Sequence, residues 1–203
     1  MYSQNSEESA ILAAVGTKVG KFLDIGAFDS KWCSNTLALV ERGWSGVMVE
    51  PALHPFRELL NNQGDNPKIV LVQAAVGTER GVVKFWNAPS GVATTDPAHF
   101  QKWNKELPYD HPYFIPQISL AELLNKWPGP YDVVSIDTEG TSVSLFWELM
   151  KLTHSSPPQV IIVEHNNAEQ ACISVVGARY EVVERNGENL VFVRRDRGNS
   201  ARD

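Results

Sequence analysis

Continuous apolar runs of a few residues alternate with amphipathic segments along most of this chain. The amphipathic segments have apolar positions at helical spacing, which predicts helices at residues 7–16, 34–43, 55–63, 119–127 and 142–152. The apolar runs predict buried strands at residues 21–26, 45–51, 68–76, 131–137 and 158–164. Such strands, separated by helices, are typical of a parallel sheet covered on both faces. The pattern predicts an α/β protein with a doubly wound, Rossmann-like sheet.

The C-terminal part of the chain has a different pattern. Residues 180–185 and 189–195 are two apolar-rich strand candidates that are separated by the strong turn signal Asn186-Gly187. We therefore expect a mainly parallel, seven-stranded sheet that ends in an antiparallel C-terminal hairpin.

Residues 87–118 interrupt the alternation with prolines, aromatic residues and two histidines. A connection of this length is usually a functional lid or a disordered segment, and the aromatic content favours a lid. We expect a single domain over residues 1–203 with a lid-like insertion at about 87–118. Residues of the insertion that are candidates for acceptor recognition, or for a packed surface loop or homo-oligomer contact, are Thr94, Thr95, His99, His111 and Tyr113.

Composition narrows the class of protein. The chain has 203 residues, 43% of them hydrophobic, and two cysteines, which cannot form a disulfide framework. No apolar run approaches the ~20 residues that span a bilayer, and the start "MYSQNSEES" has no signal-peptide pattern. The net charge of -6 disfavours a nucleic-acid partner. We expect a cytoplasmic protein with no membrane partner and no nucleic-acid partner.

The stretch "KFLDIGAFDS" at residues 21–30 passes from an apolar run to an acid and a glycine. In open α/β sheets ligands bind beyond the carboxyl ends of the strands, where Asp24, Gly26 and Ala27 would lie. Glu50 ends the next strand, at a position where an acid commonly accepts both hydroxyls of a ribose. The pattern predicts nucleoside binding; the alternative is that Asp24 caps a helix and Glu50 is an exposed strand end.

The glycine pattern argues against a dinucleotide. Pyrophosphate binding favours G-x-G-x-x-G, but here Gly26 is followed by Phe28 and Lys31 at the positions of the later glycines. A ligand with a ribose and no phosphate fits better, and S-adenosylmethionine (SAM) is a common one.

Several motifs together resemble one family. The run "DIGAFDS...SNTLALVERGWSGVMVEP" and then "LVQAAVG", "SLAELL", "VVSIDTEG" and "VIIVEHN" are similar, in order and spacing over roughly residues 21–166, to the FkbM-type SAM-dependent methyltransferases. The family pattern D-I-G-A-N-x-G is matched except that Phe28 replaces Asn and Ser30 replaces Gly, and Ser142 stands where the family often has an acid. The resemblance implies the class I methyltransferase fold, whose sheet has one reversed strand near its end.

The resemblance also implies roles for individual residues. The loop at Gly26, with Asp24 and Ala27, would hold the methionine part of SAM, and Glu50 would hold the ribose. Ala74 and Ala75, in the turn that ends at Val76, would border the adenine. Asp137 and Glu139 would face the reaction site, with Asp137 also beside the cofactor.

Two ways of activating the acceptor stay open. His165 follows the strand at 158–164 and is expected near Asp137, so it is a candidate general base together with Asp137 and Glu139. The second way uses a divalent cation such as Mg²⁺. Its candidate ligands are Asp137 together with Glu164 or Asn166, and His165 is a further candidate. Oxygen donors at a sheet edge also arise as helix caps.

The function that we expect is transfer of a methyl group from SAM to a hydroxyl of a small molecule or carbohydrate. The alternatives are an NAD-dependent oxidoreductase and a SAM-binding scaffold without catalysis. We expect Trp32 and Trp44 to pack in the core, and Cys33 to be a buried small apolar side chain.

Overall fold

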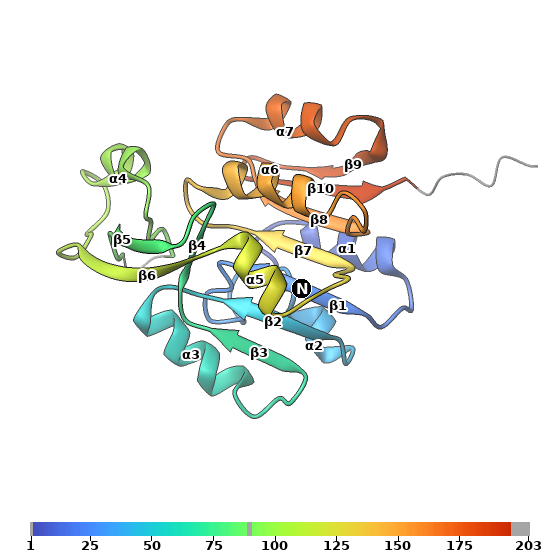
Figure 1. The fold of residues 1–203 in the computed structure, drawn as a ribbon, viewed down its shortest axis with the longest axis horizontal. Coiled ribbons are helices and arrows are strands. Elements are labelled where there is room, and N and C mark those ends of the chain that lie inside the picture. Colours follow the sequence, from blue (N-terminus) through green and yellow to red (C-terminus); the bar gives the residue numbers. More distant parts are fainter. Residues whose placement is uncertain (1, 89–90, 196–203) are drawn as a thin grey trace, which may run out of the picture.

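A seven-stranded, mostly parallel sheet forms the centre of the molecule (Figure 1). The computed structural model describes residues 2–88 and 91–195. The strands, in their order across the sheet, are β3 (Ile69–Val72), β2 (Ser45–Val49), β1 (Lys21–Ile25), β7 (Val133–Ile136), β8 (Val160–Glu164), β10 (Asn189–Arg194) and β9 (Tyr180–Arg185). Strand β10 runs antiparallel to both neighbours, and the other pairs are parallel. The predicted doubly wound sheet with a C-terminal antiparallel hairpin is confirmed.

Helices cover both faces of this sheet. Helices α1 (Glu7–Val15), α2 (Leu37–Glu41) and α3 (Leu53–Gln63) contribute to one apolar cluster. Helices α5 (Leu120–Lys126), α6 (Ser142–Leu152) and α7 (Glu169–Val176) contribute to the other cluster. In β1, Phe22 belongs to the first cluster, whereas Leu23 and Ile25 belong to the second. Burial on both faces explains why the central strands are continuous apolar runs.

Two helices differ from the sequence prediction. Helix α2 is limited to five residues of the predicted 34–43. Helix α7 was not predicted, although it buries Cys172 and Val176 against the sheet.

The strand predicted at residues 68–76 is in fact two strands in two sheets. Strand β3 ends at Val72, and residues 75–77 form β4 (Ala75–Gly77) in a second sheet. This second sheet has the order β4-β6-β5, where β5 is Gly81–Phe85 and β6 is Tyr113–Ser119. An apolar run carries no signal for a change of partner strand, so the division was missed.

The insertion at 87–118, for which we expected a lid, contains regular structure. It contains α4 (Pro97–Trp103) and most of β6, and residues 89–90 of the insertion lie outside the described residues. Asp96 caps α4 by accepting a hydrogen bond from the Ala98 backbone N–H at 2.8 Å. Phe100 of α4 stacks on Trp86 at 4.9 Å between ring centroids. Figure 1 shows α4, β5 and β6 as a lobe on the side toward which β2 and β7 point.

No helix within residues 2–88 and 91–195 is long and apolar enough to cross a membrane.

Candidate cofactor and acceptor site

A cavity of about 640 Å³ lies at the carboxyl ends of the parallel strands and beneath the lobe that contains α4. Its lining comes from the segments that follow β1, β2, β7 and β8, from the start of β4, and from α4. The predicted site residues that line it are Asp24, Gly26, Ala27, Glu50, Ala74, Ala75, Asp137, Glu139, Glu164 and Asn166. The sheet edge therefore brings together all the predicted cofactor, catalytic and metal residues except His165. Of the candidates in the insertion, Thr95 and His99 also line the cavity, whereas Thr94, His111 and Tyr113 do not.

Gly26 is required by the packing of two strands. Its backbone has φ +89°, and a Cβ at this position would lie 1.6 Å from the backbone oxygen of Asp137. The N–H groups of Gly26 and Ala27 both donate to the Val49 carbonyl, at 2.9 and 3.0 Å. The glycine thus permits close approach of the protein's own backbone, in addition to leaving space in the cavity.

Two buried acids lie at the carboxyl ends of the first two strands, Asp24 within β1 and Glu50 directly after β2. Asp24 is 4% exposed and accepts a hydrogen bond from the Thr36 hydroxyl at 2.6 Å, while burial raises the pKa of Asp24 to about 6. Glu50 is 6% exposed and accepts from the backbone N–H of Phe28 at 3.0 Å and of Ala52 at 2.7 Å. Burial raises the pKa of Glu50 to about 7. Each Glu50 oxygen can accept one further hydrogen bond, which suits a pair of hydroxyl groups.

The loop after β1 contains three residues in the left-handed conformation. They are Phe28 with φ 49°, Ser30 with φ 60° and Cys33 with φ 55°. Glycine and asparagine adopt this conformation at lower cost than other residues. Phe28 and Ser30 therefore adopt a conformation that asparagine or glycine would adopt at lower cost.

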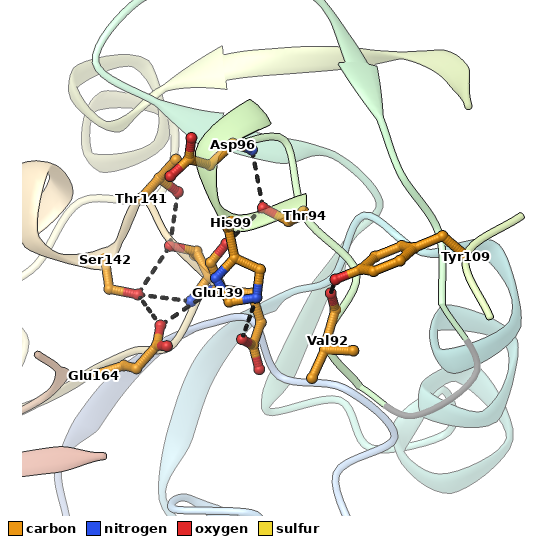
Figure 2. Close-up of polar contacts among 10 residues, drawn as sticks. Val92, Thr94, Asp96, His99, Tyr109, Glu139, Thr141, Ser142 and Glu164 are labelled. Atoms are coloured by element: carbon orange, nitrogen blue, oxygen red, sulfur yellow. Dashed lines mark hydrogen bonds and ion pairs between the residues drawn. The ribbon is translucent and has the colours of Figure 1, made fainter. Parts of the chain in front are cut away.

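Three carboxylates meet at the ends of β7 and β8. Oxygen atoms of Asp137, Glu139 and Glu164 all lie within 4.8 Å of one another. Glu164 is oriented by the Ser142 hydroxyl at 2.7 Å and by the Glu139 backbone N–H at 3.1 Å (Figure 2). Burial raises the pKa of Glu139 to about 8, and the charge of Glu164 adds to the increase. Burial, followed by the charges of Glu164 and Glu139, holds the pKa of Asp137 well above its usual range.

Helix α4 places a histidine beside these acids. Figure 2 shows the His99 ring pointing toward the carboxylate of Glu139, with 3.3 Å between Nε2 and Oε2. The Thr94 hydroxyl, just before α4, donates to the Glu139 carbonyl at 2.5 Å. A Cβ on Gly140 would lie 2.9 Å from the His99 Cβ, so this glycine lets α4 dock closely. Burial lowers the pKa of His99, which favours the neutral imidazole.

His165 does not line the cavity, contrary to expectation. Its Nε2 lies 3.1 Å from the Asn186 carbonyl oxygen, and its backbone N–H donates to the Glu188 carbonyl at 2.8 Å. The ring is therefore at the turn between β9 and β10. Because successive side chains at a strand end point to opposite sides, Glu164 takes the cavity side and His165 the other. Asn166 has φ 48° and lines the cavity.

Several residues that line the cavity were not predicted as site residues. Trp32, expected in the core, is 74% exposed and lines the cavity, and Cys33, expected to be buried, is exposed and also lines it. Trp44 is fully buried, as expected. The remaining unpredicted lining residues include Gln4, Lys102, Trp103 and Glu188. They belong to loops, to α4 or to the N-terminal segment, whose positions depend on long-range packing and leave no local signal in the sequence.

No protein-family model matches the chain, and no curated protein matches it in sequence. Solved structures do resemble it. The methyltransferase FkbM from Methylobacillus flagellatus KT aligns with a TM-score of 0.55 and 15% identity, covering 86% of this chain and 43% of that protein. The putative methyltransferase yhhF from Escherichia coli aligns with a TM-score of 0.51 and 11% identity, covering 96% and 88%. Monomeric WbdD aligns with a TM-score of 0.50 and 10% identity, covering 95% and 41%.

These likenesses establish the fold. The chain has the Rossmann-like fold of class I methyltransferases, including the reversed strand β10 between β8 and β9. The chain spans less than half of the length of the FkbM structure that it matches.

Proposed function

We propose that this protein is a SAM-dependent methyltransferase that acts on a hydroxyl group of a small molecule or carbohydrate. The observation that carries the proposal is the cavity of about 640 Å³, which brings the buried Glu50 and the acids that follow β7 and β8 to one sheet edge. Its volume lies in the range of about 300–1,000 Å³ that is usual for small-molecule sites. The similar folds of FkbM and yhhF support the same activity.

In this proposal different residues of the chain bind different parts of SAM. Gly26, Ala27 and Asp24 hold the methionine part, and Glu50 accepts hydrogen bonds from the ribose hydroxyls. Ala74 and Ala75 are small enough to leave space for the flat adenine. When bound, SAM supplies an activated methyl group, and the protein aligns the acceptor with it.

Activation of the acceptor falls to the acids after β7. Asp137 and Glu139 take the proton of the hydroxyl, or a divalent cation held by Asp137 and by Glu164 or Asn166 activates it. The structure gives no support to His165 as the base, since its ring lies at the turn between β9 and β10. We also propose one domain in which α4 and its flanking residues cover the acceptor, and a net charge of -6 favours an acceptor without phosphates.

Both alternative functions have less support than the methyltransferase function. For an NAD-dependent oxidoreductase the loop after β1 lacks the later glycines, and α2 begins only at Leu37, so no helix N-terminus follows Gly26 directly. A SAM-binding scaffold without catalysis is suggested by Phe28, Ser30 and Ser142, which differ from the residues usual in the FkbM-type pattern. Against a scaffold, Phe28 and Ser30 hold left-handed conformations in the loop after β1, and Ser142 orients Glu164.

Calorimetric titration with SAM and, separately, with NAD tests the proposal. We expect SAM to bind and Glu50→Ala to weaken binding by about 1 to 3 kcal/mol, the scale of hydrogen bonds to a charged group. Glu58→Ala, which removes an exposed acid of α3, is the matched control and should bind SAM as the wild type does. Binding of NAD without SAM would overturn the proposal. SAM binding without formation of S-adenosylhomocysteine across a panel of glycosides would favour the scaffold.

A further inference from the structure

Within the described residues, no lysine or arginine forms an ion pair with the carboxylates of Asp137, Glu139 and Glu164. Lys102, which also lines the cavity, lies over the Trp103 ring at 4.5 Å. Three acids that face one another in a half-buried site repel, and a cation removes the repulsion.

The spacing of these oxygens fits a single divalent ion. Ions such as Mg²⁺ bind oxygen at about 2.1 Å, so opposite ligands of one ion are about 4.2 Å apart. The oxygens of the three acids lie within 4.8 Å of one another, which small side-chain rotations bring to that distance. Glu164 is already held by Ser142 and by the Glu139 backbone, so one ligand is oriented before an ion binds.

His99 provides an independent observation that points to a ligand here. Its side chain is 8% exposed, and Nε2 lies 3.3 Å from Glu139 Oε2. This contact lacks the geometry of a hydrogen bond, and within the described residues His99 Nε2 has no hydrogen-bond partner. A buried imidazole nitrogen without a partner is costly. A separation of 3.3 Å is close to the ~3 Å between adjacent ligands of one ion with bonds of about 2.1 Å.

We propose that Asp137, Glu139 and Glu164 bind one divalent cation and that His99 of α4 supplies a nitrogen ligand to the same ion. Three carboxylates and one imidazole suit Mn²⁺ better than Mg²⁺, because imidazole favours transition metals. The ion ties α4 to the sheet edge. This ligand set differs from the one predicted from sequence, because it contains Glu139 and His99 and lacks Asn166 and His165. The proposal does not rest on the methyltransferase function.

Mn²⁺ titration of the full chain, without SAM or acceptor, tests this site by the paramagnetic resonance signal of free Mn²⁺. We expect one ion per chain, and about 10- to 100-fold weaker binding in Glu139→Gln. His99→Ala should weaken binding about tenfold. Glu188→Gln is the matched control: it removes an acid that lines the same cavity and whose charge acts on Glu139, but that lies outside the cluster, so Mn²⁺ affinity should fall by no more than about threefold. Circular dichroism spectra of all variants establish that they are folded.

Three outcomes would overturn the proposal. Absence of Mn²⁺ binding at millimolar concentration removes the site. If Glu139→Gln and Glu188→Gln weaken Mn²⁺ binding equally, the ion is attracted by the overall negative charge of the cavity and is not coordinated by Glu139. Unchanged affinity in His99→Ala removes the histidine from the ligand set. SAM titration of the same samples is a separate measurement, so failure of the cation site and failure of the methyltransferase proposal are distinguishable.

Discussion

At the scale of single residues, Gly26 offers a direct test of how β1 and β7 meet. We expect Gly26→Ala to lower the free energy of unfolding by about 3 kcal/mol or more, because the new Cβ would lie 1.6 Å from the Asp137 carbonyl oxygen, at φ +89°. Denaturant unfolding followed by circular dichroism measures this loss.

Gly16→Ala is the control that separates backbone strain from collision. Gly16 also has a positive φ, +57°, but a Cβ there meets no atom within 4 Å. Its substitution should cost about 1 to 2 kcal/mol, less than Gly26→Ala, because it adds backbone strain without a collision. Equal losses in the two variants would mean that Gly26 is needed for its φ alone and that the neighbouring strand relaxes away.

The acids of the site were predictable as residues, but their orientations were not. Asp24 is the second-last residue of β1, and Glu50 and Asp137 directly follow β2 and β7; that pattern is visible in the sequence. Whether Glu164 or His165 faces the cavity depends on the side of the sheet to which each side chain points at the end of β8. A shift of one residue in the strand would exchange the two. His99 reaches the acids only because α4 docks on the loop after β7, a contact between segments about forty positions apart in the sequence.

At the scale of elements, strands that are buried along their whole length can be predicted from the sequence, and exposed strands cannot. The central strands are buried on both faces and were predicted from their apolar runs. Strand β5 is largely exposed, with Val82 70% exposed, so neither a continuous run nor a clean alternation marks it. The second sheet was missed for this reason, and the end of β3 was missed because the apolar run continues into β4.

Helix α4 is the element whose docking on the rest of the protein is easiest to perturb. We expect Gly140→Ala to displace α4, because its Cβ would lie 2.8 Å from Asp96 Oδ2 and 2.9 Å from the His99 Cβ. Backbone amides of residues 97–104 should then exchange hydrogen faster, while the central strands keep their protection. Hydrogen exchange with mass spectrometry measures both regions.

The control for this variant is Gly177→Ala, at the end of α7. Gly177 has φ +54°, and a Cβ at that position would meet no atom within 4 Å, so the substitution adds strain without collision. Unchanged exchange in α4 of Gly140→Ala would show that the helix is held by its aromatic contacts, such as Phe100 on Trp86, and not by the fit over Gly140.

At the scale of the whole molecule, the buried acids at the sheet edge link stability to pH. Glu50 has a pKa of about 7 in the folded protein because of burial, against an ordinary value of 4.5. A folded-state pKa that is raised means that the folded protein binds the proton more tightly than the unfolded chain does. The stabilisation is fully present below pH 4.5 and is lost as the pH rises through about 7.

Comparison of the wild type with Glu50→Gln isolates this contribution, because other groups titrate in both proteins. A pKa difference of about 2.5 units corresponds to about 3 kcal/mol. We therefore expect the free energy of unfolding of the wild type, relative to Glu50→Gln, to fall by about 3 kcal/mol between about pH 4.5 and pH 8. Urea unfolding across this range measures the difference. A difference that stays constant with pH would mean that Glu50 is already charged in the folded protein at low pH, held by the N–H groups of Phe28 and Ala52, and that the site presents a fixed negative charge to its ligand.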